Sequence, residues 1–277
     1  MKFGVREICD VFLKAKVDNQ MVGNKKFSAG QPVCHFDSLK TTTVEGAATT
    51  VYAQGGKGNP RLIAWEGERT LTFTMEDALI STMGITLLTG AGLIEATESK
   101  KIVRHVTEKV VADTDGALTL LQTKVDGDDY PVYICKLDAE GDPSGDFEVS
   151  TDLKGTAGTG YLVDYYTEES SGFAQIDIEP NKFGGNYYLE ASTLFRAPNG
   201  KDYPAEFIIP NCKVQSNFTF SMASSGDPST FTYTMDAFPG VTKYDKTKKV
   251  LCAIQMFTED DTSVVTPASS SARSFEI

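Results

Sequence analysis

Three segments of the chain alternate strictly between apolar and polar residues. A period of two residues places successive side chains on opposite faces of a strand, so each segment predicts a strand with one buried face. The second and third are joined by a turn-rich linker, and we expect them to form a hairpin. The three segments are Arg69–Met75, Ser216–Met222 and Thr230–Met235.

The polar faces of these strands are uncharged and nearly uniform in chemistry. One interpretation is that they form the solvent side of an antiparallel sheet. The other is that they line a shared, water-filled lumen, and the pattern alone leaves both open. The candidate lumen-facing residues are Thr70, Thr72, Thr74, Thr219, Ser221, Thr230, Thr232 and Thr234.

A faint internal similarity links two of these strands. Thr70–Ala78 matches Thr230–Ala237 in both its alternation and its last residues. The similarity predicts that the two strands occupy equivalent places in one sheet. Chance resemblance between two alternating strands is the alternative.

Helix signals are scarce. Met75–Gly90 is the best candidate, because Glu76 and Asp77 suit a first turn and Gly84 could end the helix. Val5–Ala15 is compatible with a short helix or a strand. The apolar positions expected to pack the candidate helix on the sheet are Leu79, Ile80 and Met83.

Composition changes near residues 100 and 190 and divides the chain. The region between them holds short strand-like runs separated by acidic, glycine-rich turns, which is typical of a small Ig-like β-sandwich. We therefore predict a mainly β protein in which residues 102–186 form a domain inserted between 1–101 and 187–277. The Ser/Thr/Ala-rich segment Thr262–Arg273 is expected to be mobile, or ordered by a neighbouring molecule.

Charge and cysteine content narrow the function classes. The formal net charge is −12 and the pI is about 4.7. Such a chain is a poor candidate for gripping nucleic acid, but it suits a conduit along which DNA slides without sticking. Five scattered cysteines indicate free thiols made in a reducing compartment. No signal peptide or long apolar run is recognisable, so we expect a soluble, unexported protein.

Residues for catalysis or metal binding are few. His35 and His105 are the only histidines, and neither has a companion at metal-ligand spacing. The acidic run Asp138–Asp142 lacks the acidic twelfth residue of a calcium loop and is interpreted as a plain turn. Trp65, the single tryptophan, is expected to anchor a core or an interface. We predict no enzyme activity, no cofactor and no metal.

A glycine-rich segment, Gln54–Arg61, is the clearest candidate for a contact. A phosphate-binding loop would need Ser or Thr after its lysine and a following helix, and both are missing here. We expect instead a loop that becomes ordered against a partner. The candidate inter-subunit contact residues are Gly55, Gly56, Lys57, Gly58 and Asn59.

Three stretches, Gly58–Leu79, Ile209–Met222 and Asp227–Pro239, resemble tail tube proteins of large tailed phages. The resemblance implies a β-sandwich or half-barrel subunit, with one short helix, that forms stacked hexameric rings. In such tubes strands line a lumen through which DNA passes, while loops and termini reach the next ring. The resemblance also implies a location in the virion tail, synthesis in the host bacterial cytoplasm, and partners among tail sheath, tape-measure and baseplate proteins, with no membrane partner.

Two other functions remain open at this stage. The chain could be a capsid decoration protein or a baseplate adhesin whose inserted domain, 102–186, binds sugar or protein. It could also be an acid-rich hydrolase that uses a carboxylate pair. The adjacent acidic pairs are Glu76/Asp77, Asp128/Asp129 and Asp260/Asp261.

Overall fold

The structure is a computed structural model that describes residues 2–222, 224–225 and 229–256. The chain divides into two compact units, which we call the main unit (Met1–Ala91 with Ile178–Ile277) and the inserted unit (Gly92–Asp177). These boundaries lie nine or ten residues before the predicted ones. The reason is that β8 (Leu93–Glu95) pairs with β13 (Ala174–Ile176), and both strands belong to the inserted unit. The segment Thr262–Arg273 lies outside the described residues.

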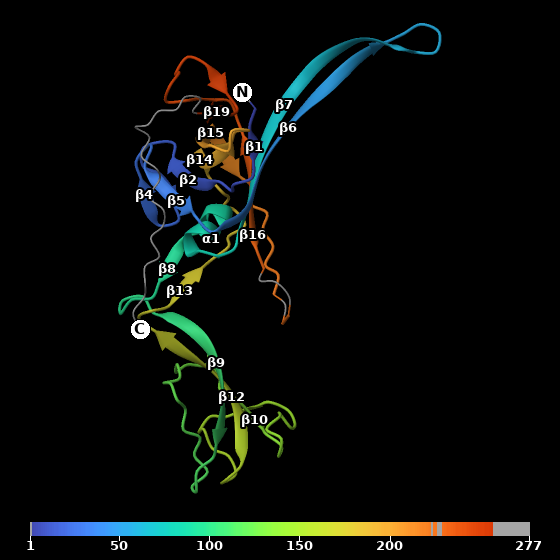
Figure 1. Cartoon of the computed structure of the whole chain (residues 1–277). Helices are drawn as coiled ribbons and strands as arrows, with labels where there is room; N and C mark the ends of the chain where they lie inside the picture. Colours follow the sequence, from blue (N-terminus) through green and yellow to red (C-terminus); the bar gives the residue numbers. More distant parts are fainter. Residues whose placement is uncertain (1, 223, 226–228, 257–277) are drawn as a thin grey trace. The chain divides into compact units, whose positions relative to one another are not determined.

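The main unit is built on one nine-stranded antiparallel sheet (Figure 1). Its strands follow the order β5-β2-β14-β15-β16-β7-β6, while β1 also pairs with β14 and β19 with β15. The described strands of this sheet are β1 (Gly4–Val5), β2 (Asp10–Ala15), β5 (Pro32–Phe36), β6 (Leu39–Gln54), β7 (Arg61–Asp77), β14 (Asn186–Arg196), β15 (Asp202–Val214), β16 (Phe231–Ala237) and β19 (Ala253–Met256). Two small hairpins accompany it, β3 (Gln20–Val22) with β4 (Lys25–Phe27) and β17 (Gly240–Val241) with β18 (Lys249–Val250).

One face of this sheet carries the hydrophobic core. Alternate residues of β7 and β16 point into it, and the predicted burial of Phe73 and Met75 is confirmed. Helix α1 (Thr82–Thr89) contributes Leu87 and Leu88 to the same core. The β3–β4 hairpin adds Val22 and Phe27, so the helix and this hairpin supply side chains from outside the sheet. The predicted mainly β fold with one short helix is confirmed for the described residues.

The two similar strands are neighbours in the sheet. β7 and β16 pair antiparallel, with Thr234 opposite Thr74. The prediction of strands at Arg69–Met75 and Thr230–Met235 is therefore correct. Because the two strands alternate in step, their apolar side chains lie next to one another on the core face of the sheet.

The predicted strand at Ser216–Met222 and its hairpin are wrong. No strand forms in this segment, although β15 leaves the Phe231–Thr234 edge of β16 unpaired; too few of the segment's apolar side chains reach the core to hold it there. Phe218 packs against the core, but Phe220 and Met222 are exposed. Thr219 and Ser221 consequently do not lie on a strand face.

The helix is shorter and begins later than predicted. Glu76 and Asp77 end β7 instead of opening the helix, and Asp77 is buried where it accepts a hydrogen bond from Ser38. Ser81 is the N-cap residue, since its hydroxyl accepts a hydrogen bond from the backbone N–H of Gly84. Gly90, at a φ of 67°, ends the helix in place of Gly84. Of the predicted apolar positions, Leu79 and Ile80 are exposed and only Met83 packs against the core.

The inserted unit contains a four-stranded antiparallel sheet in the order β11-β10-β12-β9. A second core lies on one face of it, formed by Val163 and Tyr165 of β12 together with Leu118 and Val132 from the preceding loops. The strands are β9 (Ile102–Val111), β10 (Tyr133–Lys136), β11 (Glu148–Val149) and β12 (Gly160–Glu169).

Candidate functional site

The β6–β7 hairpin extends from the main unit as a two-stranded arm (Figure 1). We use "arm" for residues 46–70. All of them are exposed except Ala53 and Gly55, which are half-buried. An isolated two-stranded hairpin is only marginally stable in water, so an arm of this length indicates a surface that is covered by another molecule.

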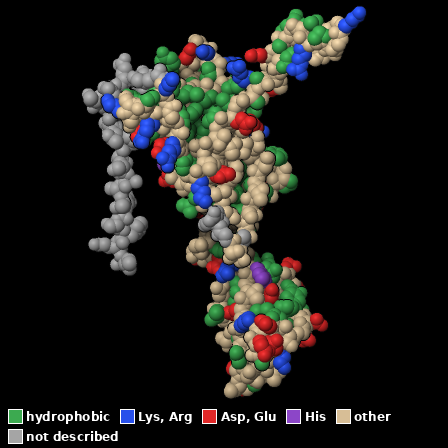
Figure 2. Space-filling view, turned by 45° about the vertical axis from the view of Figure 1, so that its right-hand side comes forward, with side chains coloured by type: hydrophobic (Ala, Val, Ile, Leu, Met, Phe, Trp, Pro, Cys, Tyr) green, Lys and Arg blue, Asp and Glu red, His purple; other side chains and the backbone are tan. Residues whose placement is uncertain are grey.

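One face of the arm is apolar. Val51 lies opposite Trp65, and Ala53 lies opposite Ile63, so these four side chains share a face. Val51, Ile63 and Trp65 are between 52% and 61% exposed. Trp65 is therefore not a core residue, and of the two predicted roles only that of an interface anchor fits its position. Figure 2 shows hydrophobic side chains along this projection.

The glycine-rich candidate contact residues form the tip of the arm. Gly56 and Gly58 have φ values of 85° and 84°, and Asn59 also has a positive φ of 48°. The turn is closed by a hydrogen bond from the Asn59 N–H to the Gly56 carbonyl (3.1 Å). Arg61 lies over the Tyr52 ring, 4.1 Å from its centroid. The segment links two strands, and not a strand to a helix, so it lacks the architecture of a phosphate loop.

A threonine-rich face covers β16, β7 and β6 on the side opposite the core. Strand pairing aligns Thr234, Thr74 and Thr43 in one row across the three strands. The sequence did not single out the residues of β6, because this strand lacks a clear apolar partner face. The polar residues that the register brings to this face are Thr41, Thr43, Glu45, Thr70, Thr72, Thr74, Glu76, Thr232, Thr234 and Asp236; Thr230 immediately precedes β16.

Carboxylates interrupt this face, which is less uniform than predicted. Glu45 and Asp236 both lie opposite Thr72, one on each side, and Glu76 lies between Thr41 and Thr232. Asp236 accepts hydrogen bonds from the Gln215 amide at 3.0 Å on both oxygens. Lys213 of β15 lies opposite Asp236 and adds one cation to the three carboxylates. The face thus combines hydroxyl groups with a negative net charge, a surface to which a polyanion has little tendency to adhere.

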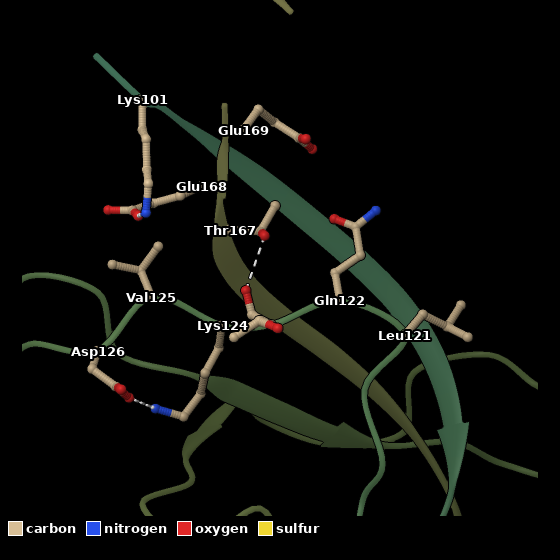
Figure 3. A pocket seen from close by; sticks show the side chains of 10 residues that line it. Lys101, Leu121, Gln122, Lys124, Val125, Asp126, Thr167, Glu168 and Glu169 are labelled. Carbon is tan, nitrogen blue, oxygen red and sulfur yellow. Dashed lines mark hydrogen bonds and ion pairs between the residues drawn. The ribbon is translucent and has the colours of Figure 1, made fainter. Parts of the chain in front are cut away.

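A hollow of about 700 Å³ lies in the inserted unit, beside the ends of β9 and β12 (Figure 3). Its charged side chains already have partners within the same unit: Lys101 pairs with Glu168 at 2.8 Å, and Lys124 pairs with Asp126. The Thr167 hydroxyl donates to the Thr123 carbonyl at 2.9 Å. Arranged in this way, these groups stabilise the loop and do not resemble a nucleophile with its base.

A smaller hollow, of about 570 Å³, lies at the base of the arm. Gly46, Ala47 and Ala48 of β6 line one side of it, and Val250–Cys252 line another. Small side chains leave room here for a side chain of another molecule.

The histidines and the acidic pairs do not assemble a catalytic site. His35 stacks on Phe12 with ring centroids 4.1 Å apart, and His105 contacts Asp164 at 2.8 Å. Asp138 accepts hydrogen bonds from the N–H groups of Glu140 and Asp142, as in a plain acidic turn. Glu76 and Asp77 point to opposite faces of β7. Asp260 and Asp261 lie outside the described residues.

The cysteines are free thiols. Three of them, Cys9, Cys135 and Cys212, are buried, and burial raises the pKa of the Cys212 thiol to about 12. Burial also raises the pKa of Cys34 to about 11. These thiols stay protonated at neutral pH and act as small core side chains.

The described part of the chain contains neither a cluster of metal-ligating side chains nor a membrane-spanning helix. Within it, no group of three or more His, Cys, Asp or Glu side chains is placed to hold a metal ion. Over the same residues there is no helix with the length and apolar character needed to cross a membrane.

Comparison with known proteins gives one match over most of the chain. Residues 4–251 match the model of the YomU/Tube protein family. No curated protein matches the chain. The matched range includes the arm, the threonine-rich face and the inserted unit.

Proposed function

The chain belongs to the YomU/Tube protein family, so it is a phage tail tube protein and a structural component of the virion tail, and we propose that it forms stacked hexameric rings through which DNA passes. The observation that carries this proposal is the arm, an exposed hairpin with an apolar face that has no partner within the described residues. A structural role also agrees with the surroundings of the histidines, thiols and carboxylates: His35 stacks on Phe12, three of the thiols are buried, and Asp138 stabilises a turn.

Ring closure is supported by the edges of the main sheet. Among the strands that the structure describes, β6 is the last of the sheet and pairs only with β7, and β5 at the other end pairs only with β2. Long unpaired edges promote uncontrolled association in a monomer, whereas a closed ring uses the same edges as its interface. We place the contact within a ring along the free edge of β6.

Ring stacking is assigned to the arm. Its apolar face, made by Val51, Ile63 and Trp65, would become buried against the next ring, and its tip, Gly55–Asn59, would contact that ring's surface. Apolar burial at the centre of an interface, with glycines that let backbones approach closely, is an arrangement that gives tight association.

The lumen is assigned to the threonine-rich face. DNA passing along it would meet hydroxyl groups, the carboxylates of Glu45, Glu76 and Asp236, and one cation, Lys213 of β15, which lies opposite Asp236. The net charge of the chain is a weaker argument than the sequence suggested, because the main unit carries a formal charge of only −1. Repulsion of DNA therefore depends on these three carboxylates. The other tail partners, sheath, tape-measure and baseplate proteins, would bind elsewhere on the assembled tube.

Labelling with two maleimides of different size tests the lumen assignment. Thr72→Cys should react with a small maleimide and with a polymer-linked maleimide in dispersed subunits, but only with the small reagent after assembly. Thr119→Cys, on an exposed loop of the inserted unit, is the control that should react with both reagents in both states. Equal reaction of assembled Thr72→Cys with the large reagent would place this face on the outside, and the unaltered protein gives the background from its own thiols.

A further inference from the structure

The negative charge of the chain is concentrated in the inserted unit. This unit holds 18 of the 38 acidic residues but only 7 of the 26 basic residues, so it carries a formal charge of −11 out of −12. The main unit is close to neutral at −1 although it is the larger of the two. Acidic side chains are dispersed over the visible face of the inserted unit in Figure 2.

Half of these carboxylates have structural partners. Asp113 accepts hydrogen bonds from two backbone N–H groups, Glu168 and Glu169 pair with Lys101 and Arg104, and Glu108 accepts from the Leu121 N–H. The remaining members of this group are Glu98, Asp126, Asp138, Asp164 and Asp177. These acids hold the turns and the strand ends of the unit together.

The other half are exposed, and their side chains form no hydrogen bond or ion pair in the described structure. Folding of the unit does not require their charge, because nothing in the unit pairs with it. Three of them, Asp146, Glu148 and Asp152, line one hollow together with Lys136 and Lys154, and the other six are distributed over several turns and strand ends. No three of the nine are placed to hold a metal ion. These residues are Glu95, Asp115, Asp128, Asp129, Glu140, Asp142, Asp146, Glu148 and Asp152.

We propose that the inserted unit is an electrostatic spacer, whose unpaired carboxylates keep separate copies of the protein, and the tubes they build, from associating through the apolar and edge surfaces of the main unit. The main unit needs such protection, because it combines near-zero net charge with a long free edge strand and an exposed apolar arm. Repulsion between like-charged molecules is long-ranged at low salt, so it opposes random contacts while leaving short-range, complementary contacts able to form. Only the part of this proposal that concerns tubes rests on the proposed function.

The test compares three proteins below the concentration at which any assembly occurs. In the neutralised variant, Asp128, Asp129, Asp142, Asp146 and Asp152 become Asn and Glu148 becomes Gln; in the matched control, the same positions exchange Asp for Glu and Glu for Asp. The osmotic second virial coefficient is measured by static light scattering for each. Circular dichroism and thermal unfolding check that the variants are folded.

The neutralised variant should lose most of its repulsion at low ionic strength. Its formal charge falls from −12 to −6, and because charge repulsion grows with the square of the net charge, the charge contribution to the virial coefficient should drop about fourfold. The control should match the unaltered protein. All three should converge in about 1 M salt, where the Debye length is about 3 Å.

Two outcomes would overturn the spacer. One is a neutralised variant whose virial coefficient equals that of the control at low salt. The other, independent of any variant, is an unaltered protein whose virial coefficient does not change with salt. Both results concern dispersed subunits, so they are separate from failure of tube formation. If tubes form, electron microscopy should show lateral bundles of the neutralised variant and separate tubes of the control; separate tubes in both would contradict the proposal.

Discussion

Replacing Trp65 with alanine should weaken assembly without changing the fold of the subunit. Trp65 lies on the arm, opposite Val51, and 52% of it is exposed. A tryptophan buries about 150–250 Å² when fully covered, so docking of the arm would newly bury on the order of 100 Å² of this residue. At about 25 cal/mol per Å², the loss in the variant is about 2.5 kcal/mol, or roughly 60-fold in the association constant.

The assay is the critical concentration for assembly, measured as the protein left in the supernatant after high-speed sedimentation. Trp65→Ala should raise this concentration by roughly 60-fold, since each added subunit loses the contact. Tyr244→Ala is the matched control, because Tyr244 is 92% exposed in the same unit but lies outside the arm. An increase of less than about threefold, or the same increase for both variants, would refute the assignment of the arm as the stacking contact. In the unaltered protein, Trp65 is the single tryptophan, so a blue shift of its emission on assembly reports its burial directly.

Three further predictions concern the subunit itself. Deleting residues 92–177 and joining the ends with a short linker should leave the main unit folded and able to assemble, because its core cluster contains no residue of the inserted unit; loss of cooperative unfolding would contradict the two-unit division. Gly90→Ala should lower the free energy of unfolding by more than about 1 kcal/mol in a denaturant titration, because the helix ends there with a positive φ and an added Cβ would lie 2.3 Å from a backbone carbonyl oxygen; an unchanged midpoint would refute this. Burial alone would raise the pKa of Glu190, but hydrogen bonds from Lys14 and Lys243 outweigh it and lower the pKa below its usual value. The contribution of the ionised Glu190 to stability is therefore present above pH 4.5 and lost as the pH falls through the lowered pKa. Glu190→Gln should destabilise the protein at pH 7 but not near pH 2. An equal effect at both pH values would be inconsistent with the ion pairs.

The sequence predicted the strands of the core better than their surroundings. The alternation in Arg69–Met75 and Thr230–Met235 is correct because the apolar side chains of both strands enter one core. Ser216–Met222 shows the same pattern, yet it forms no strand, and of its apolar side chains only Phe218 packs against the core, while Phe220 and Met222 are exposed. The alternation of apolar and polar residues within a segment does not show whether its apolar side chains will reach the core.

The functional surface was harder to predict. Trp65 and Ile63 have the composition of a core strand, and only the structure shows that they belong to an exposed arm. The glycine-rich tip, Gly55–Asn59, could be recognised from sequence because positive φ values require particular residues. From the sequence alone, the negative charge is a property of the whole chain, but most of it lies in residues 92–177. The charge of each unit can be counted only when the boundaries between the units are known.

Negative-stain electron microscopy of the purified protein at increasing concentration tests the central claim most directly. We expect hollow tubes or stacked rings with six-fold symmetry, appearing at the same concentration at which Trp65 emission shifts to the blue. Dispersed particles at every concentration, together with an unchanged Trp65 emission, would contradict the proposal that these subunits stack into a tube through the arm.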